Sequence, residues 1–141
     1  MRKTLLSILT VLLLCISCLC SASDGKDLDY QQKVVDTFMA GKSYGSIASY
    51  LDPEMRRDFT EKDYKDMFAS MDKSIGRLQQ KDFIAYQKLE GGSLLRYKAK
   101  FERAGQMQII AAFRDNGGKF TLTDLMVLEP SRSSLTINIG K

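Results

Sequence analysis

The stretch from Leu94 to Leu128 is the part of the sequence that most constrains the fold. It contains three runs of alternating apolar and polar residues, joined by two short turns that contain glycine. Successive side chains of a β-strand point to opposite faces, so this alternation predicts strands with one buried face. Short turns of this kind join antiparallel neighbours. The stretch therefore predicts an antiparallel β-meander.

The residues of this meander divide between a core face and an outer face. The second run carries Ile110 and Ala112 behind its core face, so it is expected to be a central strand. Turns are expected at Ala104-Gly105 and at 115–118, where Asn and Gly accept positive φ. The core face is predicted to hold Leu95, Tyr97, Ala99 and Phe101, then Met107, Ile109, Ala111 and Phe113, then Phe120, Leu122, Asp124 and Met126.

A further strand is expected before the meander, over Leu78–Leu89. Its central residues, 83–86, are apolar on both faces. This pattern predicts either a strand covered on both sides or a strand with a β-bulge. The segment Glu90–Ser93 is expected to form the hairpin turn that leads into the next strand.

Helical spacing of apolar residues precedes the strands. Thr60 is expected to cap the last helix, Asp63 to act as its capping-box acid, and Gly76 to end it. This helix has one apolar stripe, so it is expected to lie across the sheet. Helices followed by antiparallel strands define an α+β fold, with N-terminal helices packed on a sheet of about four strands. The four helical segments are predicted at about 27–40, 44–51, 53–59 and 60–76.

The first 23 residues have the features of a secretory signal peptide. Arg2 and Lys3 form a basic start, Leu5–Leu14 is apolar, and small residues precede Asp24. An apolar segment of about ten residues is short for a membrane span, which needs about 20. The chain is therefore expected to be exported to the periplasm, the cell envelope or the exterior, with an uncleaved anchor as the alternative.

All three cysteines, Cys15, Cys18 and Cys20, lie in this leader. The domain that follows is therefore expected to lack disulfides, zinc–thiolate sites and cysteine nucleophiles. The residues Ile16-Ser17-Cys18 resemble the end of a bacterial lipobox, in which the cysteine is acylated and becomes the mature N-terminus. Cys15 departs from that motif, which usually has an aliphatic residue there. Cleavage after Ala22 or Ser23 and lipidation at Cys18 both stay open.

Residues 24–130 are expected to form a single α+β domain. The net charge of +4 includes Arg2 and Lys3, so the domain is too weakly basic to predict a nucleic-acid partner. Only two prolines occur, and no Pro-rich linker divides the chain. The tail at 131–141 alternates Leu135, Ile137 and Ile139, which is compatible with an edge strand or a loose end.

The order and apolar spacing of these elements, from Leu28 to Glu129, resemble a small secreted bacterial domain family of unknown function. That family is similar to the cone-shaped, nuclear-transport-factor-two-like superfamily. The resemblance implies a curved sheet around a conical pocket that the N-terminal helices close. Members of the superfamily serve as enzymes, ligand-binding modules or dimerisation domains, so the resemblance implies a fold but not one activity.

The chemistry available to this chain is narrow, because it contains no histidine. A Ser-His-Asp triad and a His-rich metal site are excluded, and no metal or cofactor is expected. A carboxylate–tyrosine scheme remains, similar to that of the cone-fold ketosteroid isomerases. Asp124 is its weak catalytic candidate, with Tyr86 and Tyr97 as phenol donors. A bulge near Thr123 would instead turn Asp124 outward.

The favoured hypothesis is a non-catalytic secreted or cell-envelope module that binds an apolar small molecule or a protein partner. The alternative is a small isomerase or lyase, and a homodimer through the exposed sheet face is a third. The basic row Arg96, Lys98 and Lys100 is interpreted as solvent-facing charge that deters edge aggregation, with contact to an anionic surface as the alternative. The residues predicted to contact a ligand are Tyr86, Tyr97, Phe101, Phe113 and Asp124.

Overall fold

The computed structural model describes residues 25–130 of the chain. The predicted signal peptide at 1–23, Cys18 and the tail at 131–141 lie outside these residues, so the interpretations made for them stay predictions. The N-terminal helix spans 25–39. The other elements are α2 (Tyr44–Ile47), the 3₁₀ turn η1 (Ala48–Tyr50), α3 (Pro53–Asp58), α4 (Glu61–Ser74), β1 (Leu78–Leu89), β2 (Gly92–Phe101), β3 (Ala104–Asp115) and β4 (Phe120–Leu128).

The four strands form one antiparallel sheet in the order β1-β2-β3-β4. Sequential strands are therefore neighbours throughout, and the α+β meander predicted from the sequence is confirmed. The strand β3 lies inside the sheet, as Ile110 and Ala112 indicated. These two side chains are only partly buried, because no described helix covers the outer face of the sheet.

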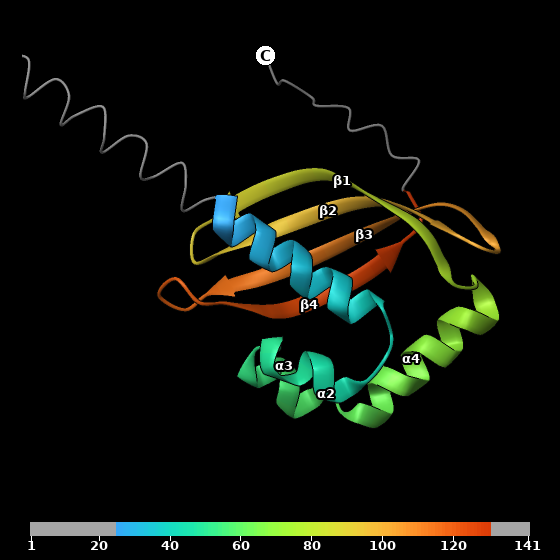
Figure 1. Ribbon diagram of the computed structural model, residues 1–141, viewed down its shortest axis with the longest axis horizontal. Helices are drawn as coiled ribbons and strands as arrows, with labels where there is room; N and C mark the ends of the chain where they lie inside the picture. The colour runs from blue at the N-terminus through green and yellow to red at the C-terminus, as the bar shows by residue number, and fades with distance from the viewer. Residues whose placement is uncertain (1–24, 131–141) are drawn as a thin grey trace, which may run out of the picture.

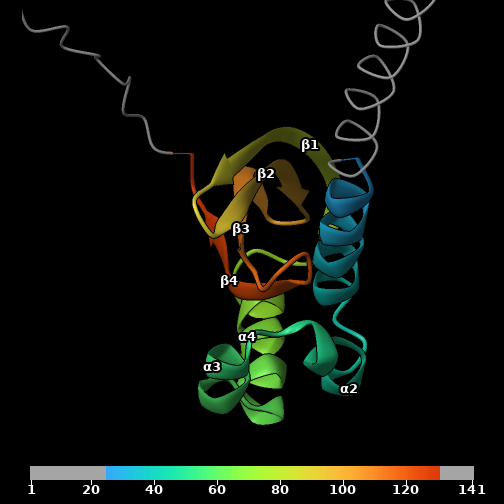
Figure 2. The same cartoon turned by 90° about the vertical axis from the view of Figure 1, so that its left-hand side faces the viewer.

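The N-terminal helix lies across the concave face of the curved sheet (Figures 1 and 2). Its inward residues are buried and meet the core residues of β2 and β3. Burying side chains of this size stabilises the fold by about 1.5–3 kcal/mol each. The helix thereby fills the concave side of the sheet. Its buried residues are Gln31, Val34, Val35, Phe38 and Met39.

The helix α4 lies beyond the edge strand β4 rather than across the sheet (Figure 2). The expectation that it crosses the sheet is therefore wrong. Its aromatic residues instead pack on the end of the N-terminal helix, where Tyr64 donates a hydrogen bond to the Phe38 carbonyl at 2.7 Å. The Tyr64 ring lies 5.3 Å from that of Phe38 and 4.9 Å from that of Phe68. The predicted Thr60–Asp63 capping box and the left-handed Gly76 are both present.

The edge strand β1 contains the β-bulge that its sequence allowed. Its register with β2 shifts between Phe83 and Ala85, so Ile84 is the extra residue. The alternative, a strand covered on both sides, is excluded because Phe83 and Ile84 are exposed. A bulge at an exposed edge also hinders pairing with another strand.

The turn between β2 and β3 lies at Glu102-Arg103, two residues earlier than expected. Contacts with the end of α4 hold it there. The Arg103 N–H donates to the Ile75 carbonyl at 2.9 Å, and the Arg77 N–H donates to the Glu102 carboxylate at 3.0 Å. Sequence alone could not reveal these long-range bonds. The hairpin at 115–118 is confirmed, with Gly117 and Gly118 at positive φ.

Candidate functional site

A cleft of about 500 Å³ lies between the end of the N-terminal helix, α4 and the start of β1. Most ligand pockets have volumes of about 300–1,000 Å³ and mainly apolar walls with a few polar groups. This cleft has both properties. Its apolar walls are Met39, Phe68, Met71, Leu78 and Phe101.

The wall of the cleft formed by α4 is fixed near its middle and at its C-terminal end. Near the middle, the Phe68 ring packs closely on Gly41, which has a φ of 64° and where a Cβ atom would lie 3.0 Å from that ring. After α4, Gly76 donates to the Met71 carbonyl at 2.9 Å and turns the chain towards β1. Close packing at Phe68 and the backbone hydrogen bond of Gly76 therefore fix the position of this wall.

Two pairs of opposite charges lie at the rim of the cleft. The Lys81 ammonium lies 2.7 Å from the Asp36 carboxylate and 4.0 Å above the centre of the Tyr97 ring. Only 16% of the Lys81 side chain is exposed, so the aromatic face and the carboxylate together hold this cation. Asp72 and Arg77, 3.8 Å apart, form a looser and more exposed pair. Each pair therefore contributes no net charge to the rim of the cleft.

Tyr97 lies beneath Lys81 and carries a buried hydroxyl that has no hydrogen-bond partner among the described residues. The side-chain nitrogen of Gln31 is also buried without a hydrogen-bond partner among the described residues. Its side-chain oxygen, in contrast, accepts a hydrogen bond from the Ser93 hydroxyl. Burial raises the pKa of Tyr97, and the nearby Asp36 carboxylate raises it further. The phenol therefore stays neutral at physiological pH and is held in place by ring packing.

We expect Tyr97→Phe to leave the free energy of unfolding unchanged or to raise it by up to about 1 kcal/mol, because the lost hydroxyl has no partner. Tyr64→Phe is the matched control and should lower it by about 1 kcal/mol, because it removes the hydrogen bond to Phe38. Urea denaturation at neutral pH measures both. If both variants lose the same free energy of unfolding, the Tyr97 hydroxyl is not without a hydrogen-bond partner.

The stability of Tyr97→Phe should also respond differently from that of the wild-type chain at alkaline pH. Because the pKa of Tyr97 is raised in the folded state, its contribution to stability is complete below the usual tyrosine pKa of about 10. That contribution is lost as the pH rises from there towards the folded-state pKa. The wild-type chain should therefore lose more stability above this pH than Tyr97→Phe, as measured by urea denaturation across the alkaline range.

The structure places the predicted ligand residues on both faces of the sheet. Tyr86, Tyr97, Phe101 and Phe113 lie on its concave side, and Phe101 alone among them lines the cleft. Asp124 lies on the outer face and is exposed, so its expected position in phase with Leu122 is wrong.

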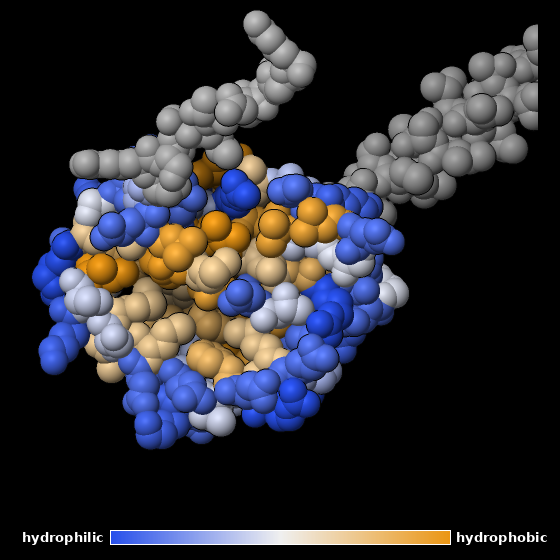
Figure 3. Space-filling model, turned by 180° about the vertical axis from the view of Figure 1, so that it is seen from behind, coloured by the Kyte–Doolittle hydropathy of each residue, from blue (hydrophilic) through white to orange (hydrophobic). Residues whose placement is uncertain are grey.

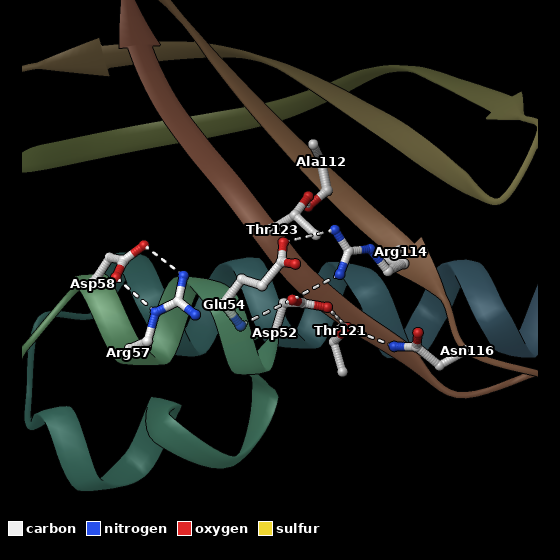
Figure 4. Close-up of polar contacts among 9 residues, drawn as sticks. All are labelled: Asp52, Glu54, Arg57, Asp58, Ala112, Arg114, Asn116, Thr121 and Thr123. Carbon is white, nitrogen blue, oxygen red and sulfur yellow. Dashed lines mark hydrogen bonds and ion pairs between the residues drawn. The ribbon is translucent and has the colours of Figure 1, made fainter.

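A β-bulge at Thr123 accounts for the outward position of Asp124. Ala112 pairs with Asp124 while Phe113 pairs with Leu122, which leaves Thr123 as the extra residue. Its hydroxyl donates to the Ala112 carbonyl at 3.1 Å (Figure 4). Because the side-chain period of a strand is two, one extra residue turns the following residues to the other face. Leu125 and Val127 therefore pack against the core instead.

A second polar cluster surrounds Asp52, which is buried at the start of α3 (Figure 4). Its carboxylate accepts from the Glu54 N–H at 3.2 Å, the Arg114 guanidinium at 3.0 Å and the Thr121 hydroxyl at 2.9 Å. Asn116 donates to the same Thr121 hydroxyl at 2.9 Å. These bonds fasten α3 to the β3–β4 hairpin. Because every carboxylate oxygen has a partner, we assign this cluster a structural role.

Sequence reasoning missed the residues that shape the cleft, above all Asp36 and Lys81. One signal was present: Lys81 lies two residues before Phe83, on the face of β1 that pairs with inward residues of β2. A lysine at such a position needs a partner for its charge. The partner, Asp36, is 45 positions earlier on another element, so only the fold brings the pair together.

Within residues 25–130, no group of three or more acidic side chains is arranged to hold a metal ion. No helix in the same range is long and apolar enough to cross a membrane.

Comparisons with known proteins identify no family for this chain. No family model matches the chain, and no curated protein matches it. Among solved structures, it is similar to the solution structure of a SEC-C motif-containing protein from Rhodopseudomonas palustris. The two are 14% identical over 65% of this chain and 70% of that chain, with a TM-score of 0.45.

Proposed function

We propose that this chain is a non-catalytic binding module that holds an apolar small molecule in the cleft between the N-terminal helix and α4. The observation that supports this proposal is the cleft itself, about 500 Å³ in volume and lined by five large apolar side chains. Two of them are methionines, whose flexible side chains adapt to ligands of different shape.

The rim of the cleft favours a neutral ligand. Lys81 and Asp36 already neutralise each other at 2.7 Å, and Asp72 lies near Arg77. A charged ligand would have to displace one member of a pair and leave the other charge without its partner. A neutral apolar molecule gains the contact with Met39, Met71 and Phe101 without that cost.

An isomerase or lyase that combines Asp124 with a tyrosine has no geometric support. Asp124 lies on the outer face of the sheet, whereas Tyr86 and Tyr97 lie on the concave side. A general base must come within hydrogen-bond reach of the proton it removes, directly or through one water. A carboxylate on the opposite face of the sheet from the phenols cannot share a substrate with them.

Export belongs to the same proposal. The leader at 1–23 would direct the domain to the periplasm, the cell envelope or the exterior, and acylation of Cys18 would tether it there. A binding module in that location would meet small apolar molecules outside the cytoplasm. The resemblance to the cone-shaped superfamily, whose members include ligand-binding modules, is compatible with this role.

The test fills the cleft and measures the binding of a neutral apolar probe, N-phenyl-1-naphthylamine. Ala40 lines the cleft and is exposed, so Ala40→Trp should occupy the space without disturbing the core. Ala69→Trp, on the exposed side of α4, is the matched control. We expect at least about tenfold weaker binding for Ala40→Trp, or about 1.4 kcal/mol, and unchanged binding for the control.

Equal affinity in the two tryptophan variants, or no binding to the wild-type chain, would refute the proposal. Native mass spectrometry of the purified protein provides a second readout. A co-purified molecule should be present in the wild-type chain and the control, and depleted in Ala40→Trp.

A further inference from the structure

The outer face of the sheet, opposite the N-terminal helix, has a row of cations that the cleft does not use. Arg96, Lys98 and Lys100 alternate along β2 with buried residues and are all exposed. None of the three forms an ion pair with another residue in the range 25–130. Three unpaired cations on alternate residues of one strand form a positive stripe about 13 Å long.

Exposed apolar side chains lie beside this stripe on the same face. The sheet register aligns Arg96 with Ile110 and Ile110 with Met126, and it aligns Lys98 with Gln108 and Gln108 with Leu128. Met126 is 39% exposed and Leu128 is 43% exposed, so both present apolar surface to solvent on this face. Arg96 and Lys98 thus each have an exposed apolar residue two strands away, about 10 Å across the sheet.

The space-filling view of this side shows apolar side chains gathered across the middle and bordered by hydrophilic ones (Figure 3). A groove of about 340 Å³ lies at one end of the cationic stripe, with Lys98 and Lys100 in its walls. Two acidic residues share the face, both on edge strands. Asp82 lies opposite Lys98 in the β1–β2 register and also lines the groove, but its carboxylate accepts a hydrogen bond from Gln80 at 2.8 Å and forms no ion pair with Lys98. Asp124 lies opposite Ala112.

We propose that this outer face docks on an anionic lipid bilayer. The cations of β2 would contact the headgroups, while Met126 and Leu128 would enter the boundary between headgroups and acyl chains. Adjacent cationic and apolar side chains are typical of surfaces that bind at this boundary. A second copy of the chain fits less well, because a two-fold contact centred on this face would bring the two cationic stripes together.

The absence of tryptophan from the sequence allows one introduced tryptophan to report the contact. In the full chain, Met126→Trp should shift its fluorescence to shorter wavelength on addition of vesicles of phosphatidylcholine mixed with phosphatidylglycerol. Pure phosphatidylcholine vesicles should give no shift. Ala69→Trp on α4 carries the same leader and should give no shift with either vesicle. The comparison therefore separates docking of the outer face from any anchoring by residues 1–23.

Charge reversal tests the cationic stripe in the Met126→Trp background. Each cation near an anionic bilayer strengthens binding roughly fivefold, so Lys98→Glu with Lys100→Glu should weaken it at least about 25-fold. Lys42→Glu with Lys119→Glu changes the net charge equally at exposed positions in loops and should weaken binding far less. Added salt should weaken the wild-type interaction as well.

The proposal is overturned by any of four results. Two concern the fluorescence with anionic vesicles: no shift for Met126→Trp, or an equal shift for Ala69→Trp. The third is an equal loss of vesicle affinity for the two charge-reversed pairs. The fourth is a fluorescence shift of Met126→Trp that appears as the protein concentration rises without vesicles. The last result would identify a second copy of the chain as the occupant. Circular dichroism of each variant confirms that the fold is retained before binding is compared.

Discussion

Replacing Asp52 with alanine is expected to lower the free energy of unfolding by about 3 kcal/mol. The change removes the N-cap of α3, worth about 1 kcal/mol. It also removes the buried acceptor of Thr121 and Arg114, and a buried donor left without a partner costs a further 1–3 kcal/mol, roughly. Urea denaturation of the variant against the wild-type chain measures the sum.

The control for this prediction is Asp52→Asn. Asparagine keeps the shape of the side chain and one oxygen for the Glu54 N–H, but it loses the charge that faces Arg114. We expect a loss of about 1 kcal/mol for this variant. If alanine costs no more than asparagine, the network of Figure 4 does not stabilise the fold as its geometry indicates.

The destabilised Asp52→Ala variant should also loosen one part of the molecule first. Asp52 joins α3 to β4 through its own N–H, which donates to the Leu122 carbonyl at 2.8 Å, and through its side-chain bonds. Without the side chain, hydrogen exchange should become faster in α3 and the β3–β4 hairpin than in β1 and β2. Uniform acceleration across the sheet would argue against a local fastening role.

Replacing Gly92 with alanine is the second change expected to have a large effect. A Cβ atom at this position would lie 2.1 Å from the carbonyl oxygen of Phe113 on the neighbouring strand. That distance is far below van der Waals contact, and the obstacle is backbone rather than a flexible side chain. The β2–β3 pairing would have to shift, at a cost of about 3 kcal/mol in the free energy of unfolding.

Gly105→Ala is the matched control, because it adds the same methyl group near the start of β3. Apart from its chain neighbours, no described residue has an atom within 4 Å of the point that a Cβ would occupy there, and its backbone does not require positive φ. We expect it to change stability by less than about 0.5 kcal/mol. Thermal or urea denaturation compares the two variants, and similar losses would show that the close approach at Gly92 is not the cause.

Much of the local structure followed from the sequence because its causes are local. The alternation of apolar residues in β2 and β3 defined both faces of those strands. The side chains of Thr60 and Asp63 capped α4 as expected. Each of these features depends on residues within a few positions of one another, and such interactions can be read from spacing alone.

The position of the candidate site could not be predicted in the same way. The sequence placed it inside the cone, with Asp124 and aromatic residues of the sheet. In the structure, the N-terminal helix fills that space, and the cleft lies to one side, where α4 stands apart from β1. The location of α4 depends on contacts with Phe38 and with the β2–β3 turn, and these residues are distant in sequence.

The orientation of Asp124 is the clearest case in which the sequence allowed two arrangements and the tertiary structure selected one. The sequence determined that β4 is a strand with alternating residues, and it allowed two phases for its second half. Only pairing with β3, through the bulge at Thr123, selected the phase that turns Asp124 to solvent and Leu125 and Val127 to the core. Leu125 and Val127 gain burial in this arrangement, while Met126 and Leu128 lose it. The physical reason for the choice is therefore that the Asp124 carboxylate stays in water, because burying an unpaired charge is costly.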